Sequence, residues 1–271
     1  MTPKLYIIAT PLGNLGDITL RAIETFKTLD VFFAEDSREL HKLLMALNIS
    51  AEGKRIYSYA SHNLKESTET AINLLLQGKS IGLVTDRGTP AISDPGARLV
   101  ERAHEENIPV IPVPGASSLT ALVSVSGIAS TEFEFIGFLP SQEKQRARLW
   151  EAIAKRGIPT VFFESPKRIR ETVEELQQVF PDGRLFMGRE MTKKFEEYKW
   201  VALGAAVPEA FTDIGEYAII LVPGKKEIVS DLDKEISIRL ASEKEWSKEV
   251  GSRLGIASSE VYNALQKLKN K

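Results

Sequence analysis

The chain has 271 residues, 43% of them hydrophobic, which is enough for one or two compact domains with sizeable cores. It contains no cysteine, so disulfides, zinc–thiolate sites and iron–sulfur clusters are excluded. The formal net charge is −2, so a nucleic-acid partner has to be held by a local basic patch. The first apolar run is too short for a signal sequence or a membrane span, which predicts a cytoplasmic protein without membrane contact.

The first part of the chain predicts alternating strands and helices around a parallel sheet. Continuous apolar runs indicate strands covered on both faces, at 5–9, 31–34, 81–85 and 109–113. Helical spacing of apolar residues fills the segments between them, with Asp17 and Ser37 as expected helix caps. We expect this first domain to cover residues 1–116.

The second part predicts a mixed sheet with two helices. Strand-like runs lie at 132–139, 159–164, 184–189, 198–203 and 217–222, and helices are expected at 142–154 and 169–180. The last three runs follow one another with short links, which favours a mixed sheet. We expect a second α/β domain over 117–225.

Charged helical sequence follows and predicts a small appendage over 226–271. Apolar spacing around Ile236, Leu240 and Leu254 indicates two or three short helices. Residues 255–261 resemble the turn of a helix-turn-helix, and a structural cap and an RNA contact are both open interpretations.

A loop rich in glycine and proline at 85–98 follows one predicted strand, where a parallel sheet delivers its loops to a ligand. The loop offers the N–H groups of Gly88 and Gly96, and the hydroxyls of Thr85, Thr89 and Ser93. These groups suit a ligand with a carboxylate and hydroxyls, such as a nucleoside-bearing amino acid. The alternative is that they only form turns.

Two pairs of acidic residues are candidates for acid–base or metal chemistry. Asp86 and Asp94 flank the loop, although Asp94 before Pro95 is favoured as a helix cap. Glu35 and Asp36 end another strand, where they either take part in chemistry or only orient Arg38. No histidine has a metal-type partner nearby, and neither a dinucleotide fingerprint nor a P-loop is present, so Rossmann cofactors are disfavoured.

Basic residues gather early in the second predicted domain, among Trp150, Phe162 and Phe163. They are Lys144, Arg146, Arg148, Lys155, Arg156, Lys167, Arg168 and Arg170. This pattern predicts a surface for the RNA backbone with stacking partners. A charged helix face over buried aromatic residues is the alternative.

Six ordered motifs resemble the ribosomal-RNA branch of the tetrapyrrole methylases. They are IIATPLGNLGD (7–17), AEDSR (34–38), TDRGTPAISDP (85–95), VPGASS (113–118), FIGFLP (135–140) and FESPKRI (163–169). The resemblance implies an enzyme that transfers a methyl group from S-adenosylmethionine to the 2′-hydroxyl of a cytidine ribose in 16S ribosomal RNA. It also implies two α/β domains with a cleft between them, unlike a Rossmann methyltransferase, and a homodimer.

Carried over by position, the resemblance implies donor contacts from Pro11, Asp86, Gly88, Thr89, Ile92, Ser117, Ser118 and Glu164. One departure is Arg87, where the family usually has alanine. This arginine either clashes with the donor, pairs with its carboxylate, or points toward RNA phosphate.

Methyl transfer to a hydroxyl needs no metal but benefits from a proton acceptor. We expect Asp36 or Glu35 to orient or deprotonate the ribose hydroxyl. We expect RNA contacts from Arg21, Arg38, Lys167 and Arg168, with 16S RNA or the 30S subunit as the partner. Two alternatives are methylation of a tetrapyrrole or another small acceptor, and a non-catalytic RNA-binding factor, for which Arg87 is the only hint.

Overall fold

The computed structural model describes residues 2–205, 211–212, 214–224, 247–248, 250–252 and 255–269. The chain divides into a compact unit of residues 1–224 and a second unit of residues 225–271. The first unit contains two sheets with helices, and the second contains a short helical segment. The predicted α/β class with a small helical C-terminal segment is therefore confirmed.

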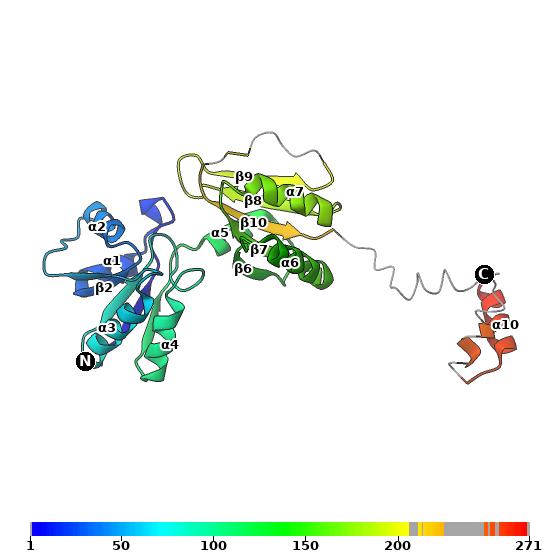
Figure 1. The fold of residues 1–271 in the computed structure, drawn as a ribbon, viewed down its shortest axis with the longest axis horizontal. Coiled ribbons are helices and arrows are strands. Elements are labelled where there is room, and N and C mark those ends of the chain that lie inside the picture. The colour runs from blue at the N-terminus through cyan, green and yellow to red at the C-terminus, as the bar shows by residue number, and fades with distance from the viewer. Residues whose placement is uncertain are drawn as a thin grey trace. The chain divides into compact units, whose positions relative to one another are not determined.

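The first sheet is entirely parallel, with the strand order β3-β2-β4-β1-β5. Its strands are β1 (Leu5–Ile8), β2 (Val31–Ala34), β3 (Arg55–Ser58), β4 (Ile81–Val84) and β5 (Val110–Val113). Its helices are η1 (Leu15–Asp17), α1 (Leu20–Thr28), α2 (Ser37–Ala46), α3 (Leu64–Leu76) and α4 (Ala97–Glu105). The predicted alternation of strands and helices is confirmed (Figure 1).

Helices cover both faces of this sheet, which agrees with the continuous apolar runs of β1, β2, β4 and β5. Helices α3 and α4 pack on one face through Leu75 and Leu99. Helices α1 and α2 pack on the other face through Phe26 and Leu44. Because all strands run the same way, the loops that follow them meet at one edge of the sheet.

The second sheet is mixed, with the strand order β6-β7-β10-β8-β9 and only the β6–β7 pair parallel. Its strands are β6 (Glu134–Phe138), β7 (Thr160–Glu164), β8 (Arg184–Arg189), β9 (Glu197–Ala202) and β10 (Tyr217–Val222). Its helices are α5 (Ser118–Ser126), α6 (Glu143–Arg156) and α7 (Ile169–Val179). The predicted mixed sheet is confirmed.

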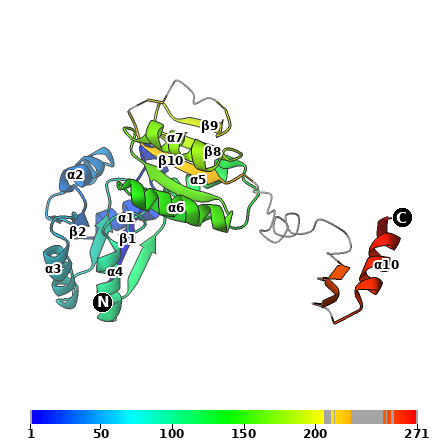
Figure 2. The same cartoon turned by 45° about the vertical axis from the view of Figure 1, so that its right-hand side comes forward.

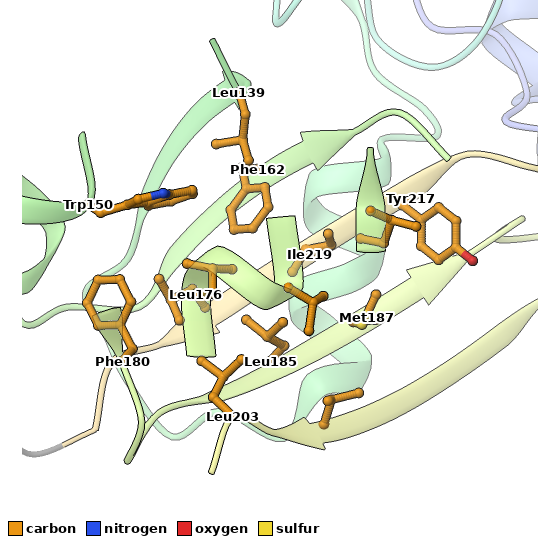
Figure 3. Close-up of a cluster of buried hydrophobic side chains, with 14 of the residues drawn as sticks. Leu139, Trp150, Phe162, Leu176, Phe180, Leu185, Met187, Leu203, Tyr217 and Ile219 are labelled. Carbon is orange, nitrogen blue, oxygen red and sulfur yellow. The ribbon is translucent and has the colours of Figure 1, made fainter. Parts of the chain in front are cut away.

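The two faces of the second sheet carry different cores. Helices α6 and α7 cover one face, where Trp150, Leu176 and Phe180 pack against Phe162 and Ile219 (Figures 2 and 3). Helix α5 covers the other face through Leu122, which contacts a cluster that contains Val161, Phe186, Ala218 and Ile220. The chain therefore enters this half of the unit through α5.

Three predicted helix caps are wrong. Asp17 lies in η1, and α1 is capped by Thr19, whose hydroxyl accepts from the N–H of Ala22 at 3.1 Å. Ser37 is the first residue of α2, and Asp36 is its cap. Asp94 does not cap α4, because the turn continues to Gly96 before the helix begins.

In the second unit, the described residues include α10 (Ser258–Lys269). The predicted turn spans 255–261, and its residues 258–261 belong to this helix. The helices expected around Ile236 and Leu240 lie outside the described residues. Among the described helices, none is both long and apolar enough to cross a membrane.

Candidate functional site

A cavity of about 640 Å³ is lined by residues that follow the first sheet and by residues of the second sheet. The first sheet contributes Glu35 and the loop from Thr85 to Asp94. The link into α5 contributes Ser117, Ser118 and Leu119. The second sheet contributes Phe138, residues 163–166, Met191 and residues 216–218. We call this hollow the central cavity.

The loop wall of the central cavity is fixed by its own backbone. Thr10 and Gly88 exchange two hydrogen bonds, of 2.9 and 3.0 Å, and Gly88 has a φ of 82°. Asp94 accepts from the N–H groups of Ala91 at 2.8 Å and Gly96 at 3.1 Å. The prediction that the N–H groups of Gly88 and Gly96 face a ligand is therefore wrong, because both already have partners inside the protein.

The hydroxyls of this loop also have protein partners. Thr89 donates to the carbonyl of Ala116 at 3.0 Å, and Thr85 donates to the carbonyl of Arg87 at 3.3 Å. Each of these hydroxyl oxygens keeps its acceptor lone pairs for a ligand. Asp94, which is half-buried in the loop, stabilises the turn, and its partial burial raises the pKa of its carboxyl group.

Two carboxylates meet where β2 and β4 end. Asp86 accepts from the N–H of Asp36 at 3.0 Å, and the N–H of Asp86 points to Glu35 Oε2 at 3.5 Å. Burial and the nearby charge of Asp86 raise the pKa of Glu35. Burial, with the charges of Asp36 and Glu39, raises the pKa of Asp86. Both residues line the central cavity.

Asp36 has a different environment from its neighbour Glu35. Arg38 donates to both of its oxygens, with its guanidinium at 2.6 Å from Oδ2 and its backbone N–H at 2.8 Å from Oδ1. These hydrogen bonds lower the pKa of Asp36 to about 2. Asp36 does not line the central cavity but a smaller groove beside it, which Pro11 also lines.

Arg87, the residue that departs from the family pattern, pairs with Glu216. Glu216 also pairs with Lys193 at 3.1 Å, and Lys193 pairs with Glu190 at 2.8 Å. Arg87 belongs to the loop after β4, whereas Glu216 directly precedes β10, and Glu190 and Lys193 lie between β8 and β9 of the second sheet. The arginine therefore joins the two walls of the central cavity.

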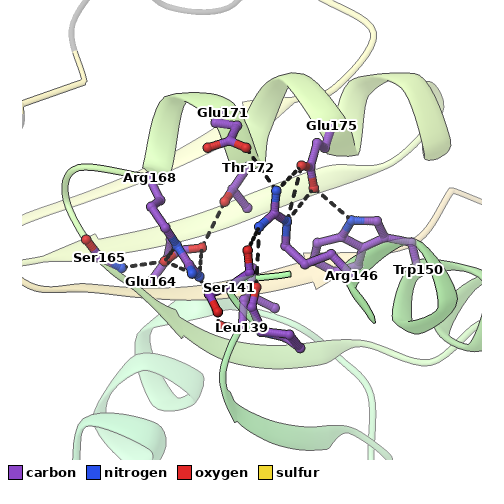
Figure 4. A network of polar contacts seen from close by, with 11 residues as sticks. Leu139, Ser141, Arg146, Trp150, Glu164, Ser165, Arg168, Glu171, Thr172 and Glu175 are labelled. Atoms are coloured by element: carbon purple, nitrogen blue, oxygen red, sulfur yellow. Dashed lines mark hydrogen bonds and ion pairs between the residues drawn. The ribbon is translucent and has the colours of Figure 1, made fainter. Parts of the chain in front are cut away.

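Glu164 lines the central cavity, but its side chain is only 1% exposed. Its oxygens accept from the N–H of Ser165 at 2.6 Å, from the hydroxyl of Thr172 at 2.8 Å and from Arg168 (Figure 4). Arg168 also donates to the carbonyl of Leu139 at 3.0 Å. This network holds the FESPKRI turn in place. The charge of Arg168 is paired with Glu164 within the protein.

Part of the predicted basic surface is internal. Arg146 is 6% exposed and pairs with Glu171 and Glu175, and Trp150 donates to Glu175 at 3.2 Å (Figure 4). Trp150 and Phe162 are core residues, so they offer no stacking surface for a base. The prediction of an RNA surface with stacking partners is wrong for these residues, because packing of α6 and α7 on the second sheet buries them.

The other predicted RNA contacts lie at the surface. Arg38 is 83% exposed, and Lys167 is also exposed. Arg21 is exposed and donates to the carbonyl of Pro112 at 3.1 Å.

Sequence reasoning missed several residues of the central cavity. Phe138 and Phe163 stand edge to face with ring centres 5.4 Å apart, and Phe138 is 62% exposed. Met191, Glu216 and Tyr217 also line the cavity. Phe138 and Phe163 lie in two of the six motifs, which is the signal that could have indicated them. Within the described residues, no group of three or more His, Asp or Glu side chains is arranged to hold a metal ion.

The family model for Tetrapyrrole (Corrin/Porphyrin) Methylases matches residues 4–206. The chain belongs to this family. Among its methylase relatives, a protein of Halalkalibacterium halodurans is 36% identical over 96% of this chain and 93% of the relative. A protein of Thermotoga maritima is 40% identical over 80% of this chain and 97% of the relative. A protein of Haemophilus influenzae is 43% identical over 72% of this chain and 69% of the relative. All three are named ribosomal RNA small subunit methyltransferase I.

Proposed function

We propose that this protein transfers a methyl group from S-adenosylmethionine to the 2′-hydroxyl of a cytidine ribose in 16S ribosomal RNA. The observation that carries the proposal is the near full-length similarity to proteins named as methyltransferases of small-subunit ribosomal RNA. The acceptor nucleoside and atom follow from the resemblance of the six motifs. In this proposal the lobes of residues 1–116 and 117–225 enclose the cofactor, and residues 226–271 form an appendage.

The central cavity fits S-adenosylmethionine in size and chemistry. Its volume of about 640 Å³ lies within the usual range for a bound cofactor. Phe138 and Phe163 offer aromatic surface to an adenine, and Ser117 and Ser118 offer hydroxyls. Asp86, Gly88, Thr89, Ile92 and Glu164 are the further proposed contacts in the lining, and Pro11 lies just outside it, in the adjoining groove. When bound, S-adenosylmethionine supplies an electrophilic methyl group on a positively charged sulfur.

Of the two carboxylates expected to accept the proton, Glu35 is a better candidate than Asp36. A base with a raised pKa holds a proton more strongly, and the pKa of Glu35 is raised, whereas that of Asp36 is lowered to about 2. Glu35 also lines the central cavity, and Asp36 does not. In the reaction, Glu35 would accept the proton of the 2′-hydroxyl while the hydroxyl oxygen takes the methyl group. The carbon–sulfur bond of the donor would break in the same step and release S-adenosylhomocysteine.

RNA binding in this proposal uses a local patch on a chain of net charge −2. Arg38 and Lys167 are exposed and available to phosphates. Arg21 and Arg168 donate hydrogen bonds to the backbone carbonyls of Pro112 and Leu139, respectively. They are therefore secondary candidates for contacts with RNA phosphates. We expect a homodimer that acts in the cytoplasm, where 16S RNA or the 30S subunit is found.

Mapping of ribose methylation on 16S RNA tests the proposal. Cells that lack the protein should lose one 2′-O-methylcytidine, and purified protein with S-adenosylmethionine should restore it on 30S particles. An unchanged methylation map would contradict the RNA substrate. A labelled tetrapyrrole mixture serves as the second arm, since transfer to it alone would favour the small-acceptor alternative. Calorimetry that detects no binding of S-adenosylmethionine would favour a non-catalytic factor.

The identity of the base is tested by two substitutions. Glu35→Gln should lower the single-turnover rate on 30S particles by about 10²- to 10⁴-fold, because the amide cannot accept the proton. Asp36→Asn should retain most of the rate on the cytidine acceptor. Equal rates for both variants and the unaltered protein would overturn the role of Glu35.

A further inference from the structure

A second, smaller hollow of about 250 Å³ adjoins the central cavity. It lies between the turn after β1 and helix α2, and we call it the α2 groove. Glu39, Thr85 and Asp86 line both the α2 groove and the central cavity. The two hollows are therefore neighbours with a shared wall at the ends of β2 and β4.

We propose that the α2 groove binds the base of the nucleotide that is methylated, and that Asp36 accepts a hydrogen bond from the amino group of that base. The inference rests on the proposed function and adds to it the place where the acceptor binds. The shared wall supports it, since a nucleoside has its ribose next to its base. A base in the α2 groove directs its ribose toward Asp86 and Glu35.

The walls of the α2 groove suit a flat, apolar-faced ring. Leu40, Leu43 and Ala46 line it from α2, and Pro11 and Leu15 line it from the turn after β1. Enzymes that do chemistry on a base take it out of its stack and hold it between aromatic or apolar side chains. The same arrangement suits a base that has to be fixed while its ribose is methylated. The small volume admits one base rather than a second cofactor.

Asp36 gives this groove a means of selecting the base. Its carboxylate is held by Arg38 and stays ionised down to about pH 2, so it only accepts hydrogen bonds. Cytosine presents an amino donor at the position where uracil presents a carbonyl acceptor. An acceptor-only carboxylate therefore favours cytosine and leaves the carbonyl of uracil without a donor.

Cations stand at the rim of the groove. Arg38 and Lys42 lie one helical turn apart on α2, with side chains 83% and 66% exposed. Their partners are the local residues Asp36 and Glu39, so both cations face solvent. Positive charge beside the groove suits the phosphates that flank an extruded nucleotide.

Filling the groove tests the location. Ala46→Trp adds a large side chain at an exposed position of α2 that lines the groove, and Ala147→Trp is the control at an exposed position of α6. Calorimetry with S-adenosylhomocysteine should give the same affinity for both variants. Equilibrium binding of a 16S RNA oligonucleotide that contains the target cytidine should weaken at least about tenfold for Ala46→Trp only. Equal RNA binding by the two variants would overturn the inference.

Replacing the carboxylate tests the selectivity. Asn caps a helix as well as Asp, so Asp36→Asn keeps α2 intact. The unaltered protein should methylate the cytidine oligonucleotide at least about tenfold faster than its uridine counterpart. The amide of asparagine both donates and accepts hydrogen bonds. Asp36→Asn should therefore methylate the uridine oligonucleotide faster and lose most of the preference for cytidine. A preference that is unchanged in Asp36→Asn would contradict a role of Asp36 in base selection.

The outcomes separate this inference from the proposed function. Failure of the unaltered protein to bind S-adenosylhomocysteine or to methylate RNA contradicts the proposed function itself. Normal methylation by Ala46→Trp contradicts only the α2 groove as the acceptor site.

Discussion

Glu35 and Asp86 bring two carboxyl groups together at the ends of neighbouring strands, and this has a consequence for stability. Burial raises the pKa of each group; the charge of Asp86 adds to this for Glu35, and the charges of Asp36 and Glu39 add to it for Asp86. A carboxyl group whose pKa is raised by folding favours the folded state below its ordinary pKa and loses that contribution as pH rises through the raised value. At neutral pH the ionised pair therefore opposes folding.

We expect Glu35→Gln to stabilise the protein at pH 7 by up to about 1 kcal/mol, because the half-exposed site is partly screened by solvent. The gain should disappear below about pH 4, where the carboxyl group is protonated in both states. Urea unfolding at both pH values measures it, with Glu132→Gln as an exposed control. A variant that is less stable at pH 7 would show that the charge of Glu35 supports the fold.

Individual residues also show how far sequence reasoning reaches. The loop at 85–98 was predictable as a wall of the cavity, because its glycines and prolines follow a buried strand. Which of its N–H groups are free was not predictable, since Gly88 bonds to Thr10 from a distant part of the chain. The sequence shows that Arg168 is positively charged. It does not show that Arg168 forms an ion pair with Glu164, because that pair depends on how β7 and α7 pack.

At the scale of elements, the contact between α5 and β8 depends on Gly188. A Cβ added at this glycine would lie 2.7 Å from Leu122 Cδ1 and 2.8 Å from Met191 Sδ. Leu122 is fully buried, and Met191 lines the central cavity. The missing side chain therefore lets α5 approach the sheet beside the cavity.

Gly188→Ala should destabilise the protein by about 1–3 kcal/mol, because the added methyl group forces packed neighbours to move. It should also weaken binding of S-adenosylhomocysteine through the shift of Met191. Urea unfolding and calorimetry measure the two effects. Leu122→Ala removes the Leu122 methyl group that the new Cβ at position 188 would meet. The double variant should therefore lose less stability than the sum of the losses of the two single variants. Strict additivity would mean that Leu122 is not the obstacle.

The elements themselves were largely predictable, and their ends were not. Continuous apolar runs at β1, β2, β4 and β5 indicate strands covered on both faces, and the structure has them. The observed helix starts differ from the predicted ones because several nearby residues can cap the same helix. In the structure Thr19 rather than Asp17 caps α1, and Asp36 rather than Ser37 caps α2. Strand β3 was not predicted, because this edge strand is short and none of its residues is buried, with Arg55 and Ser58 exposed.

On the scale of the molecule, the two sheets of residues 1–224 are joined across the central cavity by charged side chains. Arg87 pairs with Glu216, and Glu216 pairs with Lys193, whose aliphatic chain lies against Gly13 in the turn after β1. Glu216 thus connects the loop after β4 with the second sheet at the mouth of the cavity. No periodicity in the sequence could indicate this connection, because Arg87 and Glu216 are 129 residues apart in the chain.

Glu216→Gln removes both ion pairs while keeping the shape of the side chain. Exposed pairs of this kind contribute up to about 1 kcal/mol, so we expect affinity for S-adenosylhomocysteine to fall about two- to fivefold at low salt. The difference should vanish near 1 M salt, where the pairs of the unaltered protein are screened as well. Calorimetry at the two salt concentrations measures this, with Glu151→Gln on α6 as an exposed control. A rise in affinity would instead mean that Glu216 competes with the ligand carboxylate for Arg87, and Arg87→Ala would then bind the ligand more weakly than either glutamine variant.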